Sequence, residues 1–154
     1  MPSAFEQLDH AWIAARIPHA GSMCLLDSVK SWDAQHIVCV ASNHCSADNP
    51  LRANDRLGSV VGIEYAAQTM AVHGALLAGK DDNSKPPAGF LAIVRDVSWH
   101  VDRLDNQPDA LAVMATRISG DDTTILYNFD IHCRDTLLMS GRAAVMLAAS
   151  TENR

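Results

Sequence analysis

Several features that would indicate a common class of function are scarce or missing in this 154-residue sequence. Basic residues are few: 12 Lys and Arg stand against 18 Asp and Glu, and a formal net charge of -6 argues against a general nucleic-acid binder. The four cysteines, Cys24, Cys39, Cys45 and Cys133, contain no Cys-x-x-Cys pair, which argues against a zinc knuckle or a thioredoxin-like motif. His, Asp and Glu residues with metal-ligand spacing are also missing, so we expect no metal and no other cofactor.

The first residues do not have the pattern of a secretory leader. They carry acidic side chains and a helical rhythm (Phe5, Leu8, Trp12, Ile13) instead of a basic flank, an apolar run and a small-residue cleavage site. We therefore expect a cytoplasmic protein. Internal repeats and low-complexity segments are missing too, and 48% hydrophobic with 19% charged residues is ordinary globular composition. The length fits a single domain over residues 1–154.

The most unusual stretch, residues 57–79, holds a single charged side chain, Glu64, in an almost wholly apolar run. A helix that is apolar on nearly every side is buried either in a core or in a membrane. Polar residues at Gln68, Thr69 and His73 and four glycines interrupt the run, so it is a poor match to the about 20 apolar residues that cross a bilayer. The pattern predicts a buried central helix, in which His73 is a satisfied core or interface histidine.

The rest of the chain has the pattern of β-strands. Two short strands are predicted before the helix, at 24–31 and 36–42, and four longer ones after it and a polar loop at 81–87, at 89–101, 109–119, 123–134 and 137–149. Residues 127–133 alternate most clearly, with Tyr127, Phe129, Ile131 and Cys133 on one face. An antiparallel sheet curled around one apolar helix satisfies this order, so the predicted class is α+β with a hotdog fold.

Two motifs carry a resemblance to a known family. Ile17-Pro18-His19 followed by Cys24-Leu25-Leu26-Asp27-Ser28-Val29, and then Glu64-Tyr65-Ala66-Ala67-Gln68, resemble the opening signature and the central helix of the FabA/FabZ type of 3-hydroxyacyl-(acyl carrier protein) dehydratase. The resemblance is closer to the small dehydratases encoded with bacterial aryl polyene pigment clusters. The Gly-His-Phe-Pro-Gly motif of the wider family is missing: His44 is followed by a longer loop that contains Asn49-Pro50-Leu51-Arg52, which is similar to the pigment-cluster subgroup.

The resemblance implies a dehydration of 3-hydroxyacyl thioesters, with His44 as the base and Glu64 as the acid. Imidazole titrates near neutral pH, which suits a base. A carboxyl among apolar side chains has its charged form disfavoured, so Glu64 is expected to keep the proton that it delivers. Gln68, one helical turn on, is expected to orient Glu64 or the substrate. Unpaired amides at the helix start, near Gly58 and Ser59, are expected to polarise the thioester carbonyl.

The resemblance also implies partners. The substrate would arrive on an acyl carrier protein, an acidic protein with a phosphopantetheine arm, for which Arg52 is the first candidate contact. The other candidate contacts are Arg56, Arg95 and Arg103. In the resembled family the histidine and the acid of one site come from different protomers, which implies a homodimer or a heterodimer with a homologous dehydratase.

Two alternatives stay open at this level, because a fold does not fix a chemistry. The first is a hotdog acyl thioesterase, in which Glu64 would activate water against the thioester. The second is a non-catalytic hotdog subunit that pairs with an active dehydratase.

Overall fold

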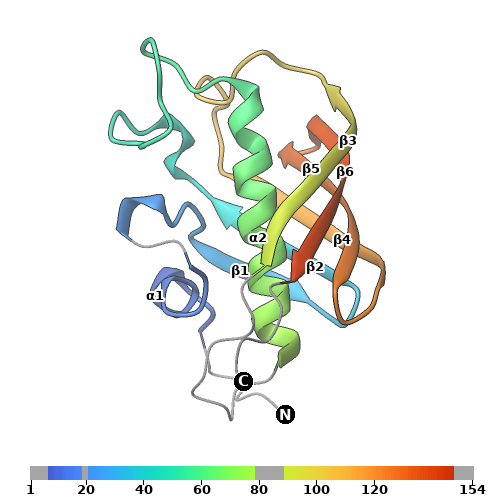
Figure 1. The fold of residues 1–154 in the computed structure, drawn as a ribbon. Helices are drawn as coiled ribbons and strands as arrows, with labels where there is room; N and C mark the ends of the chain where they lie inside the picture. Colours follow the sequence, from blue (N-terminus) through green and yellow to red (C-terminus); the bar gives the residue numbers. More distant parts are fainter. Residues whose placement is uncertain (1–6, 19–20, 79–88, 148–154) are drawn as a thin grey trace.

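The computed structural model describes residues 7–18, 21–78 and 89–147, and within these ranges a six-stranded sheet curls around the long helix α2 (Figure 1). The described elements in chain order are α1 (His10–Ala14), η1 (Gly21–Met23), β1 (Ser28–Trp32), β2 (His36–Ala41), η2 (Asn43–Cys45), η3 (Ser59–Val61), α2 (Gly62–Ala78), β3 (Gly89–Trp99), β4 (Leu111–Gly120), β5 (Thr124–Cys133) and β6 (Thr136–Leu147).

The strands lie in the order β1-β2-β4-β5-β6-β3, and every neighbouring pair is antiparallel. β2 precedes α2 in the chain and lies next to the edge strand β1, whereas β3 follows α2 and forms the opposite edge of the sheet beside β6. Figure 1 shows α2 lying across the face of the curled sheet. This arrangement confirms the predicted hotdog fold.

The core forms where alternating strand residues meet α2. On β5, Tyr127, Phe129, Ile131 and Cys133 are buried as the alternation predicted, and on β2 the buried positions are every second residue. Cys39 of β2 belongs to this layer, and burial raises the pKa of its thiol to about 12. The thiol is therefore an inert apolar group at neutral pH.

The predicted boundaries hold for most strands but are wrong at two places. The first strand begins at Ser28 instead of residue 24, because the Leu25 amide donates to the side chain of Gln68 on α2 and not to a neighbouring strand. The helix begins at Gly62 instead of residue 57, because the chain at Leu57 and Gly58 pairs with Leu104 and Arg103.

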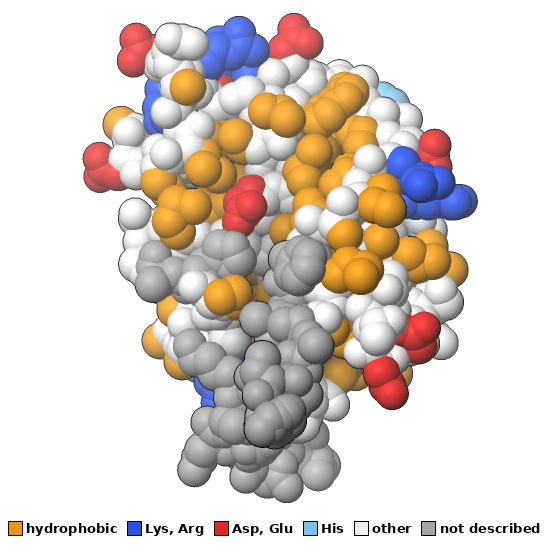
Figure 2. All heavy atoms as spheres, in the orientation of Figure 1, with side chains coloured by type: hydrophobic (Ala, Val, Ile, Leu, Met, Phe, Trp, Pro, Cys, Tyr) orange, Lys and Arg blue, Asp and Glu red, His pale blue; other side chains and the backbone are white. Residues whose placement is uncertain are grey.

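The central helix is buried on one side only. Its residues Tyr65, Ala66, Val72 and Ala75 are buried against the sheet. The opposite side is a partly exposed stripe, one residue per turn, formed by Glu64, Ala67, Ala71 and Gly74. The predicted central helix is therefore present, but in a single chain one side of it is partly exposed, and Figure 2 shows hydrophobic side chains over the region where α2 lies in Figure 1. The surroundings of Glu64 are accordingly not fully buried.

The N-terminal segment adds a short cap to the fold. α1 begins after Asp9, whose carboxylate accepts a hydrogen bond from the Trp12 amide at 3.0 Å, and Ile13 is buried. Phe5, His19, the predicted loop at 81–87 and residues 148–149 lie outside the described residues. Within the described ranges, no helix combines the length and the hydropathy that crossing a membrane requires.

Candidate active site

His44 lies in the short 3-10 turn η2, directly after β2, and its side chain is 2% exposed. Its Nε2 lies 3.1 Å from the backbone carbonyl oxygen of Gln107. A carbonyl oxygen only accepts hydrogen bonds, so Nε2 carries the ring proton and Nδ1 is left with a lone pair. No partner for Nδ1 is found in the described part of the chain. A neutral imidazole with an uncommitted nitrogen is the form that a general base needs.

The loop after His44 is organised by Asn49, whose side chain is 5% exposed. Its Nδ2 donates to the Asn43 carbonyl and to the Tyr65 hydroxyl, both at 3.0 Å, and its Oδ1 accepts from the Leu51 amide at 2.9 Å. The Tyr65 hydroxyl in turn donates to Oδ1 of Asn43 at 2.8 Å. The segment that holds His44 is thereby tied to α2, and the loop lies at the N-terminal end of that helix (Figure 1).

Glu64 occupies the first turn of α2 and is partly exposed in the single chain. Its Oε2 accepts a hydrogen bond from Nε2 of Gln68 at 3.1 Å. The predicted contact between these two residues, one turn apart on the helix, is therefore present.

Gln68 is fully buried and satisfies two further groups. Its Oε1 accepts from the Leu25 amide at 2.9 Å, and its Nε2 also donates to the Met23 carbonyl at 2.7 Å. One amide side chain therefore fixes the carboxyl of Glu64 and attaches the segment before β1 to α2. Both Oε1 and Nε2 of the Gln68 side chain therefore form hydrogen bonds to other groups of the protein.

The expectation of unpaired amides near Gly58 and Ser59 is wrong in the case of Ser59. The Ser59 amide donates to the Asp102 carbonyl at 2.9 Å, and its hydroxyl donates to the Val101 carbonyl at 2.6 Å. The Gly58 carbonyl accepts from the Val61 amide at 3.1 Å in the 3-10 turn that precedes α2. The amides of Ser59 and Val61 therefore have hydrogen-bond partners, whereas a helix that began at residue 57 would leave the amides of its first turn unpaired.

Arg52, the predicted carrier-protein contact, takes part in a local ion-pair network. Its guanidinium lies 3.6 Å from the Asp105 carboxylate and donates to the Asp55 carbonyl at 2.8 Å. Arg103 holds the same carboxylate through two hydrogen bonds, at 2.8 and 2.6 Å. The hydrogen bonds from Arg103 are the main reason that the pKa of Asp105 is well below its usual range. Both arginines thus have a close acidic partner within the chain.

His73 lies on the same helix but far along it, and it is fully buried. Its Nδ1 lies 2.8 Å from the Tyr127 hydroxyl and its Nε2 lies 2.8 Å from the Asp33 carbonyl. Burial is the main cause that lowers the pKa of His73. With both nitrogens paired, His73 is the satisfied core histidine that the sequence predicted.

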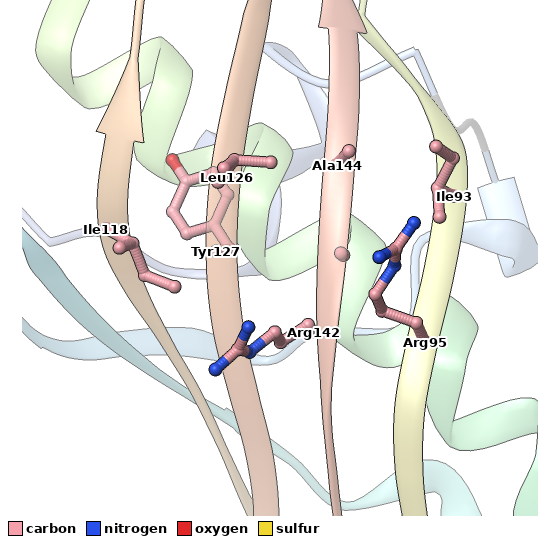
Figure 3. A pocket seen from close by; sticks show the side chains of 8 residues that line it. Ile93, Arg95, Ile118, Leu126, Tyr127, Arg142 and Ala144 are labelled. Carbon is pink, nitrogen blue, oxygen red and sulfur yellow. The ribbon is translucent and has the colours of Figure 1, made fainter.

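A hollow of about 360 Å³ lies on the other face of the sheet, and Figure 3 shows the side chains around it. Leu126 and Ala144 line it, as do their strand neighbours Tyr127 and Ala143, although these two residues are buried. The other lining residues are Ile93, Arg95, Ile118 and Arg142. This hollow is separated from His44 and Glu64 by the sheet.

Arg95 and Arg142 are directly opposite each other in the antiparallel pairing of β3 with β6. Arg142 lies 4.0 Å from Asp96, and no ion pair of Arg95 is found among the described residues. Like charges opposite one another on neighbouring strands repel. The hollow therefore combines an apolar floor with excess positive charge, on a chain whose net charge is -6.

His44, Glu64 and Gln68 are predicted from the sequence, but the residues that hold them in place are not. These residues are Asn43, Asn49, Tyr65 and, through its carbonyl, Gln107. The available signal was the pair of polar asparagines on either side of His44, in a loop where each would need a hydrogen-bond partner. Among the described residues, no cluster of three or more His, Cys, Asp or Glu side chains could hold a metal ion.

Comparisons with known proteins give one family and several structural relatives. A model of the ApeP-like family, described as ApeP dehydratase, matches residues 11–153. The dehydratase heterocomplex ApeI:P from Xenorhabdus doucetiae is similar in structure, with a TM-score of 0.79, 23% identity, and coverage of 91% of this chain and 93% of that one. A comparison with curated proteins found no match.

Two more distant structures share the fold. AziG of S. sahachiroi gives a TM-score of 0.59 at 12% identity, covering 83% of this chain and 94% of that one. A mutant of the thioesterase PA1618 from Pseudomonas aeruginosa gives 0.57 at 11% identity, covering 79% and 80%. At these identities the similarity concerns the fold and not the chemistry.

Proposed function

This chain belongs to the ApeP-like dehydratase family, and on that premise we propose that it removes water from 3-hydroxyacyl thioesters carried by an acyl carrier protein. The observation that supports this most directly is the buried imidazole of His44, whose Nε2 faces a carbonyl while Nδ1 has no partner in the described residues. His73, in contrast, has a hydrogen-bond partner on each of its two ring nitrogens.

In the proposed reaction Nδ1 of His44 takes a proton from C2 of the acyl chain. The electron pair of that C–H bond forms the C2–C3 double bond, and the C3–O bond breaks. The leaving hydroxyl takes a proton from Glu64 and departs as water, after which His44 returns its proton to Glu64 directly or through solvent. Each positioned proton transfer contributes about 10²- to 10⁴-fold in rate.

Gln68 supports the acid role of Glu64. Gln68 donates a hydrogen bond to Oε2 of Glu64 and so fixes the orientation of the carboxyl group. Gln68 is itself held by the backbone at Met23 and Leu25, so the carboxyl is oriented by a rigid neighbour. A fixed donor orientation is what a positioned proton transfer requires.

The active unit is proposed to be a dimer, with a second copy or with a homologous dehydratase. The partly exposed stripe of α2 (Glu64, Ala67, Ala71, Gly74) supports this, because it leaves small apolar side chains and a catalytic carboxyl only partly covered in one chain. The structural relative named above is a dehydratase heterocomplex. In such a dimer, His44 of one protomer and Glu64 of the other form each composite site.

The carrier protein is proposed to dock on the outer face of the sheet, at the hollow between Arg95 and Arg142 (Figure 3). Charge complementarity favours an acidic partner there, because Arg95 and Arg142 are partners in the β3–β6 pairing and both line the hollow. Ile93, Ile118 and Leu126 are 48%, 50% and 41% exposed and supply an apolar surface beside the two arginines. Arg52 and Arg103 are weaker candidates, since both already pair with Asp105.

The function is tested by incubating the purified protein with a 3-hydroxyacyl carrier protein, alone and with the homologous dehydratase, and measuring the mass of the bound acyl group. We expect loss of one water. The double variant His44→Ala/Glu64→Gln removes one group from each composite site of a heterodimer and both groups from each site of a homodimer, and should slow the reaction by about 10²-fold or more. His36→Ala, at an exposed histidine, is the matched control. Unchanged turnover in the double variant would mean that this chain is a non-catalytic subunit.

A thioesterase is the second candidate, because the thioesterase PA1618 shares the fold and a fold does not fix a chemistry. It differs in its product, which would be a free acid with a free thiol. A thiol-release assay in the same incubation separates the two reactions, and we expect no thiol release above the background.

A further inference from the structure

The hydroxyl of Tyr65 connects the two segments of one chain that carry His44 and Glu64, which contribute to different composite sites of the proposed dimer. Tyr65 follows Glu64 in α2, and its hydroxyl donates to Oδ1 of Asn43, the residue before His44, at 2.8 Å. The same hydroxyl accepts from Nδ2 of Asn49 at 3.0 Å. One buried atom therefore connects the neighbour of the acid with the neighbour of the base.

Burial and hydrogen bonding both make this connection rigid. Tyr65 is fully buried, and burial raises the pKa of its phenol to about 12, so the hydroxyl keeps its proton and remains a donor at neutral pH. Asn49 uses its second amide hydrogen on the Asn43 carbonyl and its oxygen on the Leu51 amide. In a satisfied buried network each bond restricts the others.

The imidazole of His44 is fixed from the other side as well. Its Nε2 faces the Gln107 carbonyl, and the Gln107 amide donates to the Leu104 carbonyl at 3.1 Å. The Leu104 amide donates in turn to the Leu57 carbonyl at 2.8 Å, near the start of α2. Hydrogen bonds thus connect the backbone beside His44 to α2 and the His44 ring to the segment that precedes α2.

We propose that Tyr65 is a positioning residue which, through Asn43 and Asn49, holds the His44 ring in one tautomer and sets the direction of its free Nδ1. The inference rests on the proposed dehydratase function. Without the Tyr65 hydroxyl, Asn43 loses its donor and the turn around His44 gains freedom, while the groups that bind substrate are unchanged. The effect therefore falls on turnover and on the imidazole, and not on substrate affinity.

The test is Tyr65→Phe, which removes one oxygen. We expect kcat to fall by about 10- to 100-fold, the scale of a small misplacement of a catalytic group, with KM nearly unchanged. Tyr127→Phe is the matched control, because it removes an equally buried hydroxyl with one hydrogen bond, to His73, away from the site. Equal losses of kcat in the two variants would overturn the proposal in favour of general destabilisation.

Two further measurements distinguish a loss of positioning from poor folding of the variant. Asn43→Ala breaks the same hydrogen bond from its other end, so its effect on kcat should not add to that of Tyr65→Phe in the double variant. Nitrogen NMR of the histidine rings should show His44 protonated at Nε2 in the wild type and a mixture of tautomers in Tyr65→Phe.

Additive effects, or an unchanged tautomer in Tyr65→Phe, would overturn the inference. An inactive wild-type protein would refute the proposed function instead, and the NMR comparison would still decide whether Tyr65 holds the imidazole.

Discussion

Gln68 donates a hydrogen bond to Glu64 across 3.1 Å, and the same Gln68 nitrogen donates to the Met23 carbonyl across 2.7 Å. The first bond lies within α2, and the second reaches to the segment before β1. The proposed acid is thus oriented by a side chain that also holds two parts of the fold together. Stability and turnover should therefore change together at this position.

Replacement of Gln68 by Met keeps the length of the side chain and removes all of its hydrogen bonds. The Leu25 amide and the Met23 carbonyl would lose their partner, and we expect the free energy of unfolding to fall by about 2 to 4 kcal/mol. Turnover should fall as well, because the Glu64 carboxyl loses its donor. Denaturant unfolding and the dehydration assay measure the two effects, with Gln35→Met at an exposed glutamine as the control. A variant as stable as the wild type would contradict this account.

Gly62 and Gly74 form a matched pair of helical glycines. A Cβ at Gly62 would clash with Sδ of Met139 and lie 3.0 Å from Ile131, whereas a Cβ at Gly74 meets no atom within 4 Å. We expect Gly62→Ala to destabilise the protein by about 1 to 3 kcal/mol through overpacking. Gly74→Ala should stabilise it by up to about 1 kcal/mol, the difference in helix propensity. Thermal unfolding of both variants checks the prediction, which fails if their order is reversed.

Asp105 should make the stability depend on acid pH. Arg103 lowers its pKa in the folded state below the usual value of 3.8, so on acidification the unfolded chain takes up the proton first. The stabilisation is complete above pH 3.8 and is lost as the pH falls through the lowered folded-state pKa. Asp105→Asn should therefore be less stable than the wild type at neutral pH, and the difference should shrink at acid pH. Urea unfolding across this pH range measures it, with Asp135→Asn, at an exposed turn, as the control. A difference that does not change with pH would contradict the ion-pair explanation.

The sequence predicted the elements well because their signals are local. The apolar run of α2 and the alternation of Tyr127, Phe129 and Ile131 are set by neighbours a few residues apart. The errors came from long-range pairing. The Leu25 amide bonds to Gln68, 43 residues away, and this contact removes residues 24–26 from the predicted strand.

In the candidate site, too, the local contacts could be predicted and the long-range contacts could not. Glu64 and Gln68 could be predicted because they are one helical turn apart. The Asn49–Tyr65 bond spans 16 residues and the His44–Gln107 bond spans 63, so neither follows from spacing in the sequence. The exposure of Glu64 could not be predicted either, because it depends on which face of α2 the sheet covers.

The outer face of the sheet allows the carrier-protein interaction to be tested separately from the chemistry. Arg95 and Arg142 border the hollow on the face away from α2, so reversing their charges should leave His44 and Glu64 undisturbed. For Arg95→Glu/Arg142→Glu we expect the KM for a carrier-bound substrate to rise by about 10-fold and to become less sensitive to salt. Turnover of a short thioester without a carrier protein should stay at the wild-type rate.

Two other charge reversals complete the comparison. Lys30→Glu, on the exposed edge strand β1, controls for a change of net charge. Arg56→Glu tests the loop before α2, where the Arg56 guanidinium donates to the Asp102 carbonyl at 3.3 Å. If Arg56→Glu raises the KM for the carrier-bound substrate and the Arg95/Arg142 pair does not, the carrier protein docks at the loop and the assignment to the sheet face is wrong. If the Arg95/Arg142 pair raises this KM and Arg56→Glu does not, the carrier protein docks on β3 and β6. This is the result we expect, because Asp96 is the one acidic residue that forms an ion pair with Arg95 or Arg142 among the described residues.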